Sequence, residues 1–125
     1  MTRDDAVAFA AQWADAWNEL AVDRVLGYFS EDVTFASPTA MAVVGAGTVR
    51  GKAALRAYWS SALAHIGALR FVVERALWDD TTRELAIIYV SRVNGRAKRV
   101  SENLTFGPDG LVVSAEVFHG VSVES

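Results

Sequence analysis

The spacing of the apolar residues changes halfway along this chain, and the change limits which folds it can adopt. Up to about residue 66 apolar side chains recur every three or four positions, the period of one helix face. From about residue 70 they alternate with polar ones in segments rich in β-branched and aromatic residues, which is typical of strands. Helices followed by antiparallel strands predict an α+β domain whose helices cover one face of a sheet.

Turn residues divide the two halves into elements. Helices are predicted at residues 3–20, 23–29 and 52–66. Strands are predicted at residues 33–35, 70–79, 84–93, 98–106 and 111–119. Asn94-Gly95 is a strong signal for a type I′ hairpin turn. Ser37-Pro38 is expected to end the first strand, and residues 42–51 to form a hairpin return or a loop. We find no linker or repeat, so residues 1–125 are expected to form a single domain.

Composition excludes several classes of function. The net charge is −3 and the 12 Lys and Arg residues are dispersed, whereas a nucleic-acid binder would show a basic stripe. The chain has no Cys and only two His, so we expect no disulfide, no metal site and no cofactor. No window approaches the roughly 20 apolar residues of a membrane span. The acidic residues near the N-terminus argue against a signal peptide, and a reducing cytoplasm is the expected location.

Five phrases occur in order along the chain: AWNEL, VLGYFSEDVTFASP, VRGKAALRAYW, ENLTFGPDG and VFHG. Their order and spacing resemble the NTF2-like superfamily over nearly the whole chain, and above all its SnoaL-like and ketosteroid isomerase-like branch. The resemblance implies a cystatin-like cone, in which a curved mixed or antiparallel sheet wraps around three N-terminal helices and encloses an apolar pocket. Members include isomerases, polyketide cyclases, epoxide hydrolases and non-catalytic binders, so the fold leaves the activity open.

The resemblance to ketosteroid isomerases also implies where the pocket residues lie. Ser37 stands before Pro38, where that family carries the aspartate that moves the proton, and a hydroxyl is no unassisted base near neutral pH. Trp13 and Trp59 stand where the family has two pocket tyrosines. These changes argue against the ordinary steroid isomerase mechanism. Trp13, Phe29 and Trp59 are expected on the pocket wall as substrate-binding residues. Ser37 and Trp13 are expected to orient the ligand as hydrogen-bond donors.

Glu102 interrupts an apolar face, because Val100, Leu104 and Phe106 share its side of the predicted strand. An ionised carboxylate buried there without partners would cost several kcal/mol, so the group is protonated, paired or turned to a wet pocket. The resemblance places the family's second pocket acid at this position, which implies a catalytic role. The alternative is a structural acid that binds an arginine at a rim or a dimer interface.

His119 ends the last predicted strand, where the family has a pocket aromatic residue. Imidazole gives and takes a proton near neutral pH, so Glu102 and His119 form the most attractive acid–base pair in the sequence. Antiparallel pairing around the turn at 107–110 would bring the two residues close together. The alternative is a hydrogen-bonded or solvent-facing histidine at a strand end.

The leading functional hypothesis is therefore a cofactor-independent isomerase, cyclase or hydrolase that binds a small apolar organic molecule. The alternative is a ligand-binding or interaction module of the same fold, whose pocket holds a ligand or is filled by indole rings.

We also expect a homodimer. The strand at 84–93 is apolar on both faces, with Ile88 and Val90 on one and Ile87 and Tyr89 on the other. The helices cover only one face, and a second subunit is the simplest cover for the other.

Overall fold

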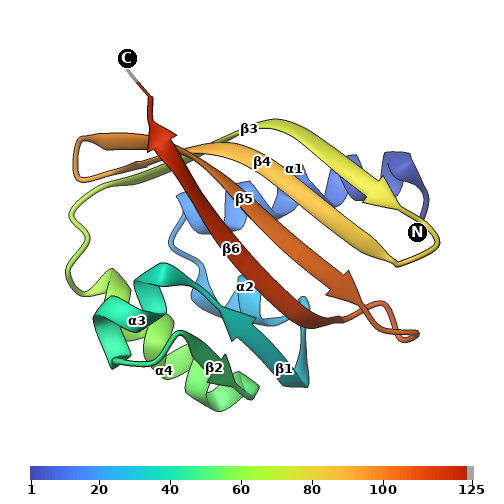
Figure 1. The fold of residues 1–125 in the computed structure, drawn as a ribbon, viewed down its shortest axis with the longest axis horizontal. Helices are drawn as coiled ribbons and strands as arrows, with labels where there is room; N and C mark the ends of the chain where they lie inside the picture. Colours follow the sequence, from blue (N-terminus) through green and yellow to red (C-terminus); the bar gives the residue numbers. More distant parts are fainter. Residues whose placement is uncertain (124–125) are drawn as a thin grey trace.

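The computed structural model describes residues 1–123, which form four helices and one sheet of six strands (Figure 1). The helices are α1 (Arg3–Asn18), α2 (Val22–Leu26), α3 (Pro38–Val44) and α4 (Lys52–Leu63). The strands are β1 (Phe29–Ala36), β2 (Thr48–Arg50), β3 (Leu69–Asp79), β4 (Glu84–Val93), β5 (Arg96–Phe106) and β6 (Val112–Ser122). The α+β class and the cone implied by the resemblance are confirmed.

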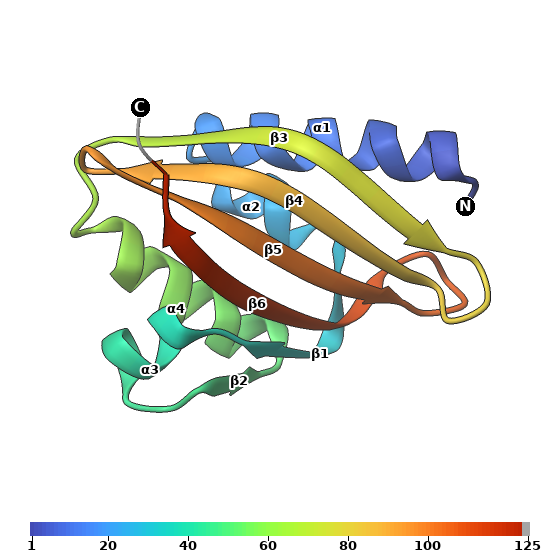
Figure 2. The same ribbon diagram turned by 45° about the horizontal axis from the view of Figure 1, so that its top comes forward.

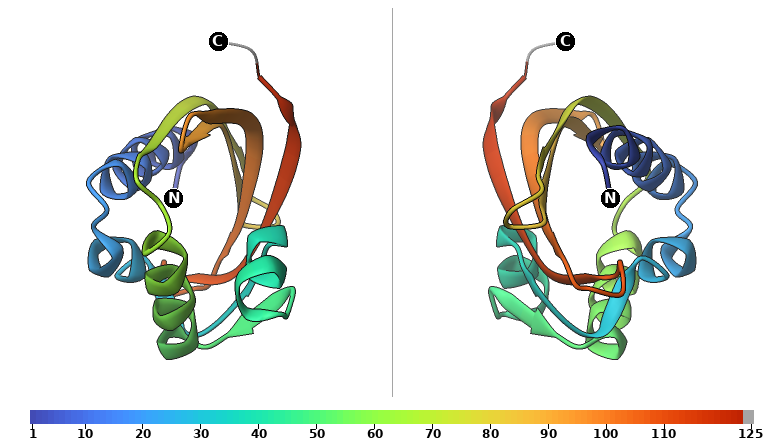
Figure 3. Two further views of the ribbon diagram at one scale, coloured as in Figure 1. Left: turned by 90° about the vertical axis from the view of Figure 1, so that its left-hand side faces the viewer. Right: turned by 90° about the vertical axis from the view of Figure 1, so that its right-hand side faces the viewer.

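The sheet is mixed and strongly curved. Its strand order is β2-β1-β6-β5-β4-β3, and all neighbours are antiparallel except β1 and β6, which run parallel. Register shifts interrupt the pairing of β3 with β4 and of β5 with β6, and such bulges bend a sheet. The long strands β3–β6 therefore curve around α1, α2 and α4 (Figures 2 and 3). The Asn94-Gly95 turn is confirmed, because both residues have positive φ.

Helix α1 lies along β3 and is anchored at both ends (Figure 2). At its start Thr2 and Asp5 form a capping box, in which each side chain accepts a hydrogen bond from the other residue's backbone N–H. Its buried face carries several alanines, whose small side chains let the helix approach the sheet closely. At its end the Asn18 amide donates to the Phe71 carbonyl and accepts from the Phe71 N–H.

Segment 42–51 differs from the expected loop, because it contains the end of α3 as well as β2. Residues at the two ends of α3 explain why this additional helix forms. Ser37 caps it by accepting a hydrogen bond from the Thr39 N–H at 3.1 Å, and Pro38 provides a preset φ at the first helical position. Gly45 ends it in the left-handed conformation. The cone therefore has four helices where three were expected.

Within residues 1–123 no helix has both the length and the apolar character needed to span a bilayer.

Candidate functional site

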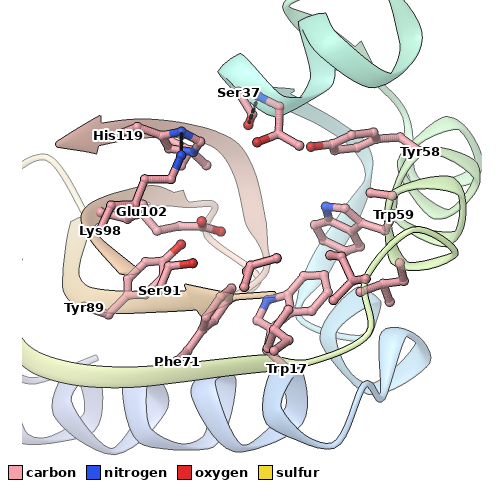
Figure 4. A pocket seen from close by; sticks show the side chains of 18 of the residues that line it. Trp17, Ser37, Tyr58, Trp59, Phe71, Tyr89, Ser91, Lys98, Glu102 and His119 are labelled. Carbon is pink, nitrogen blue, oxygen red and sulfur yellow. Dashed lines mark hydrogen bonds between the residues drawn. The ribbon is translucent and has the colours of Figure 1, made fainter. Parts of the chain in front are cut away.

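A cavity of about 310 Å³ lies between the concave face of the sheet and helices α1, α3 and α4 (Figure 4). Its apolar wall combines aliphatic side chains with the aromatic rings of Trp17, Phe35, Trp59 and Phe71. Its polar groups include Ser37, Thr39, Tyr58, Tyr89, Ser91 and Glu102. Basic residues Arg96, Lys98 and His119 also line it. The indole rings stand on the wall and leave the cavity open, so it is not filled by tryptophan.

Four of the six residues singled out in the sequence line this cavity, namely Ser37, Trp59, Glu102 and His119. Trp13 and Phe29 do not, contrary to expectation: both are fully buried in the hydrophobic core. Trp13 lies one helical turn before Trp17, and its ring is covered by Phe71 and Tyr89, at centroid distances of 5.6 and 5.0 Å.

The indole N–H of Trp13 has no hydrogen-bond partner among the described residues, and the surrounding rings separate it from the cavity. It is therefore not placed to orient a ligand. Phe29 begins β1, and its ring packs edge-on against Trp59 at 5.4 Å. Trp17, one turn further along α1, occupies the wall position that the sequence argument assigned to Trp13.

Glu102 points from β5 into the cavity and is only 4% exposed (Figure 4). Strand pairing places it between Ile87 of β4 and Val117 of β6, two apolar neighbours on the same face. Burial raises the pKa of Glu102 to about 8, and a hydrogen bond from Tyr89 opposes this only in part. No cation forms an ion pair with Glu102 within the described chain. The reading as an arginine-bound rim acid is therefore wrong, and the carboxyl is mostly protonated at pH 7.

Two phenol groups complete the polar part of the pocket, and neither was among the site residues predicted from the sequence. Tyr89 lies beside Glu102, while Tyr58 reaches in from α4 on the side of Ser37 (Figure 4). Burial raises the pKa of Tyr89 well above its ordinary value, and the nearby Glu102 carboxylate adds to the shift. Burial likewise raises the pKa of Tyr58, against an opposing hydrogen bond with Ser37. The strand alternation contained a signal for Tyr89, because Tyr89 and Ile87 share a face and Ile87 pairs with Glu102.

His119 is half-buried, and its Nδ1 lies 3.0 Å from the Lys98 ammonium. Burial lowers the pKa of His119, and the charge of Lys98 lowers it further. An ammonium has no acceptor, so a protonated Lys98 must donate to Nδ1, which leaves Nε2–H as a donor. The lowered pKa and the contact with Lys98 both favour the neutral form of His119.

Glu102 and His119 lie on neighbouring strands but form no direct hydrogen bond or ion pair in the described structure. Glu102 pairs with Val117, and Val100 pairs with His119, so the two groups are diagonal neighbours on one face. The proximity inferred from antiparallel pairing is therefore present. A ligand in the cavity can meet both residues, but His119 already has Lys98 as its partner.

No group of three or more His, Asp or Glu side chains that could hold a metal ion comes together within residues 1–123. The chemistry available to the described pocket residues is hydrogen bonding and proton transfer at carboxyl, phenol, imidazole and ammonium groups. The aromatic rings of the wall would pack against an apolar body with flat surfaces.

The curved sheet, the helices that it encloses and the lined cavity define a protein of the NTF2-like class. The SnoaL-like domain profile matches residues 10–120, and the chain belongs to this family. No curated protein matches the sequence.

Solved structures give the same fold. A SnoaL-like protein of unknown function from Burkholderia thailandensis E264 is 32% identical, with a TM-score of 0.84 over 96% of this chain and 98% of its own. A putative ketosteroid isomerase from Kribbella flavida DSM 17836 is 20% identical, with a TM-score of 0.75 over 98% and 83%. TerC co-crystallised with polyporic acid is 16% identical, with a TM-score of 0.75 over 90% of each chain. The last two likenesses show the fold alone.

Proposed function

We propose that this protein binds a small, largely apolar organic molecule in the cavity and transforms it without a cofactor. The reaction is an isomerisation, cyclisation or hydrolysis in which Glu102 and His119 are the acid–base groups. One observation carries the proposal: a buried carboxyl with a pKa of about 8 faces an open cavity. Such a group is poised between its two protonation states near physiological pH, which suits proton transfer.

Glu102 has two uses in such a reaction. In its protonated form it donates a hydrogen bond to a ligand oxygen and stabilises negative charge as that charge develops there. In its ionised form it takes a proton from an acidic carbon or from a water molecule. The Tyr58 hydroxyl is a further donor near the same part of the cavity (Figure 4). We assign orientation of the ligand to Ser37 and Trp59.

His119 is the second acid–base group in this proposal, and its lowered pKa suits a base rather than an acid at pH 7. The Lys98 ammonium donates a hydrogen bond to Nδ1 of His119, so His119 takes up a proton at Nδ1 only when Lys98 moves away. The assignment of Glu102 therefore has stronger geometric support than that of His119.

The structural neighbours support binding of a ring-containing ligand. TerC, which has the same fold, was co-crystallised with polyporic acid, and another neighbour is a putative ketosteroid isomerase.

We place the protein in the reducing cytoplasm, in keeping with a chain that has no Cys. We further propose a homodimer formed through the outer face of the sheet.

A non-catalytic binding module is the second candidate, and one observation favours it. Ser37 replaces the carboxylate that the isomerase pattern requires before Pro38, and its hydroxyl already caps α3. In this case the cavity holds its ligand without turnover.

Native mass spectrometry of the purified protein identifies a retained ligand, and turnover of that compound and its analogues is then measured. Glu102→Gln should lower kcat at least about tenfold, since a positioned acid–base group contributes 10²–10⁴-fold. Glu116→Gln is the matched control, because Glu116 is an exposed acid on β6 and should leave kcat unchanged. Equal kcat values for wild-type protein and Glu102→Gln would remove Glu102 from the mechanism. Binding without turnover of any analogue would favour the binding module.

A further inference from the structure

The charged side chains that line the cavity are opposite in sign to the net charge of the chain. The protein is acidic, with a net charge of −3, yet the charged groups of the lining at pH 7 are Arg96 and Lys98, while Glu102 is mostly protonated. Both cations lie on β5, on the same side of the strand as Glu102. The cavity therefore has positive charge at one end and a neutral acid further along the same strand.

These two cations have no carboxylate partner within residues 1–123. The ion pairs of the described chain are Arg24–Glu19, Arg56–Asp23 and Arg99–Glu74, all with exposed side chains. Arg99 provides the contrast, because it points to the opposite face of β5 and binds Glu74 through two hydrogen bonds. Lys98 instead contacts the imidazole of His119, and no carboxylate among residues 1–123 compensates its charge at the cavity.

The backbone is shaped to place Lys98 beside His119. The β5–β6 register shifts between Lys98 and Val100, so that β6 has an extra residue next to Gly120. A Cβ atom at Gly120 would lie 2.8 Å from the Arg99 carbonyl oxygen, so only glycine permits this close approach. Such bulges redirect side chains next to binding sites. The resulting group, Arg96, Lys98 and the Nε2–H of His119, offers several hydrogen-bond donors at one end of the cavity.

Glu102 lies further along β5 and borders this group of donors. Lys98 is four positions before Glu102, so their Cα atoms are about 13 Å apart at roughly 3.3 Å per residue. His119 is a diagonal neighbour of Glu102 and lies on the same side of the cavity. The indole rings of Trp17 and Trp59 lie across the cavity from these groups (Figure 4). A molecule that satisfies the whole cavity thus has an anionic group and a neutral oxygen on one side, and an apolar body that packs against the indole rings.

We propose that the ligand is an amphipathic organic anion, whose carboxylate or similar group is bound by Arg96, Lys98 and His119 while its apolar body packs against Trp17 and Trp59. This inference rests on the proposed function, because it names the ligand class of the same cavity. It also supplies what that proposal lacked for His119: an anion that attracts Lys98 would release Nδ1.

Two fluorescent probes that differ by one anionic group test the inference. 8-Anilinonaphthalene-1-sulfonate carries a sulfonate, and N-phenyl-1-naphthylamine has the same aromatic body without it. Each probe is titrated into the wild-type protein, into the double variant Arg96→Gln/Lys98→Met and into Arg99→Gln. Arg99→Gln is the matched control, because it removes one positive charge from the same strand on the other face. Circular dichroism establishes that each variant is folded.

The double variant should bind the sulfonate probe at least about tenfold more weakly, since charge-assisted hydrogen bonds are lost, and the neutral probe within about twofold of wild type. Arg99→Gln should change neither affinity by more than about twofold. Added salt should weaken sulfonate binding to wild type more than to the double variant.

Two results would overturn the inference, and only one of them would also overturn the proposed function. If the double substitution changes the two affinities equally, anion recognition is wrong, although binding of an apolar body in the cavity stands. If neither probe binds saturably to the wild-type protein, the ligand-binding cavity itself is wrong, and the proposed function falls with it.

Discussion

Proton binding at Glu102 is linked to folding, because its carboxyl is buried in the native state and free in water in the unfolded chain. The pKa of Glu102 rises from 4.5 to about 8 on burial, so the native state holds this proton more tightly than the unfolded state does. The corresponding stability is fully present below about pH 4.5. It is lost as the pH rises, until the carboxyl ionises in the native state near pH 8.

We therefore expect the free energy of unfolding of the wild-type protein to fall relative to that of Glu102→Gln between about pH 5 and pH 8. The glutamine variant keeps a neutral polar group of similar size and has no proton to lose. The relative loss is up to roughly 5 kcal/mol, from 1.36 kcal/mol per pKa unit. Urea denaturation of both proteins at several pH values measures it. Parallel pH profiles would show that Glu102 has an ordinary pKa.

Sequence reasoning at the residue scale succeeded where a residue broke a pattern. Glu102 stood out because a carboxylate interrupted an apolar alternation, and the structure places it in the cavity. Tyr89 broke no pattern, since a tyrosine is common on a strand face, and was missed. Trp13 and Trp17 differ by one helical turn, and the helical period does not decide which of them is covered by the sheet. That depends on how far Phe71 and Tyr89 extend over the helix.

Among the elements, α1 and β3 are joined by a specific polar contact as well as by packing. Asn18 ends α1, and its side-chain amide makes two hydrogen bonds with the backbone of Phe71. β3 is an edge strand, and the contact satisfies both polar groups of one of its residues. Phe71 also lines the cavity, so this contact holds part of the aromatic wall in place.

We expect Asn18→Ala to lower the free energy of unfolding by about 1–3 kcal/mol, because it leaves a part-buried donor and acceptor of Phe71 unpaired. Gln12→Ala is the control, since Gln12 is an exposed amide on the same helix and should change stability by less than about 0.5 kcal/mol. Chemical denaturation measures both. Similar stabilities for the two variants would mean that packing alone joins α1 to β3.

The long elements were predictable because the spacing of their apolar residues repeats several times. Helix α3 was not predictable in this way. A helix of seven residues has too few turns to show a period, and it depends on its caps. Ser37-Pro38 and Gly45 are those caps, and the sequence contained them. The expected strand end at Ser37-Pro38 is correct, but the same residues also begin a helix.

On the scale of the whole molecule, the outer face of the sheet exposes several large apolar side chains. Val72, Leu77 and Phe118 are 46%, 55% and 54% exposed, and strand pairing aligns Ile88, Ser101 and Phe118 in one row across β4, β5 and β6. This is the surface that we propose as the homodimer interface.

Phe118→Asp should convert a dimer into a monomer, because a carboxylate at the centre of an apolar interface is desolvated without a partner. Val44→Asp is the control, since Val44 is an exposed apolar residue on α3, away from the outer sheet face. Size-exclusion chromatography with light scattering at micromolar concentration gives the masses. A wild-type protein that is already monomeric would refute the proposed dimer.

The pairing of β1 with β6 was the least predictable part of the fold. The antiparallel strands β3–β6 follow one another along the chain through short turns, so local signals specify their order. The parallel contact instead joins strands separated by α3, β2, α4 and the three intervening strands, and no local signal marks it.

That long-range contact also has a consequence for biosynthesis. A ribosome makes β1 early and β6 late, so β1 and its short partner β2 emerge while the place beside them in the sheet is still vacant. Until β6 arrives, one edge of β1 offers unpaired peptide groups to any neighbouring chain. The nascent protein is therefore most open to edge-to-edge association before β6 has been made.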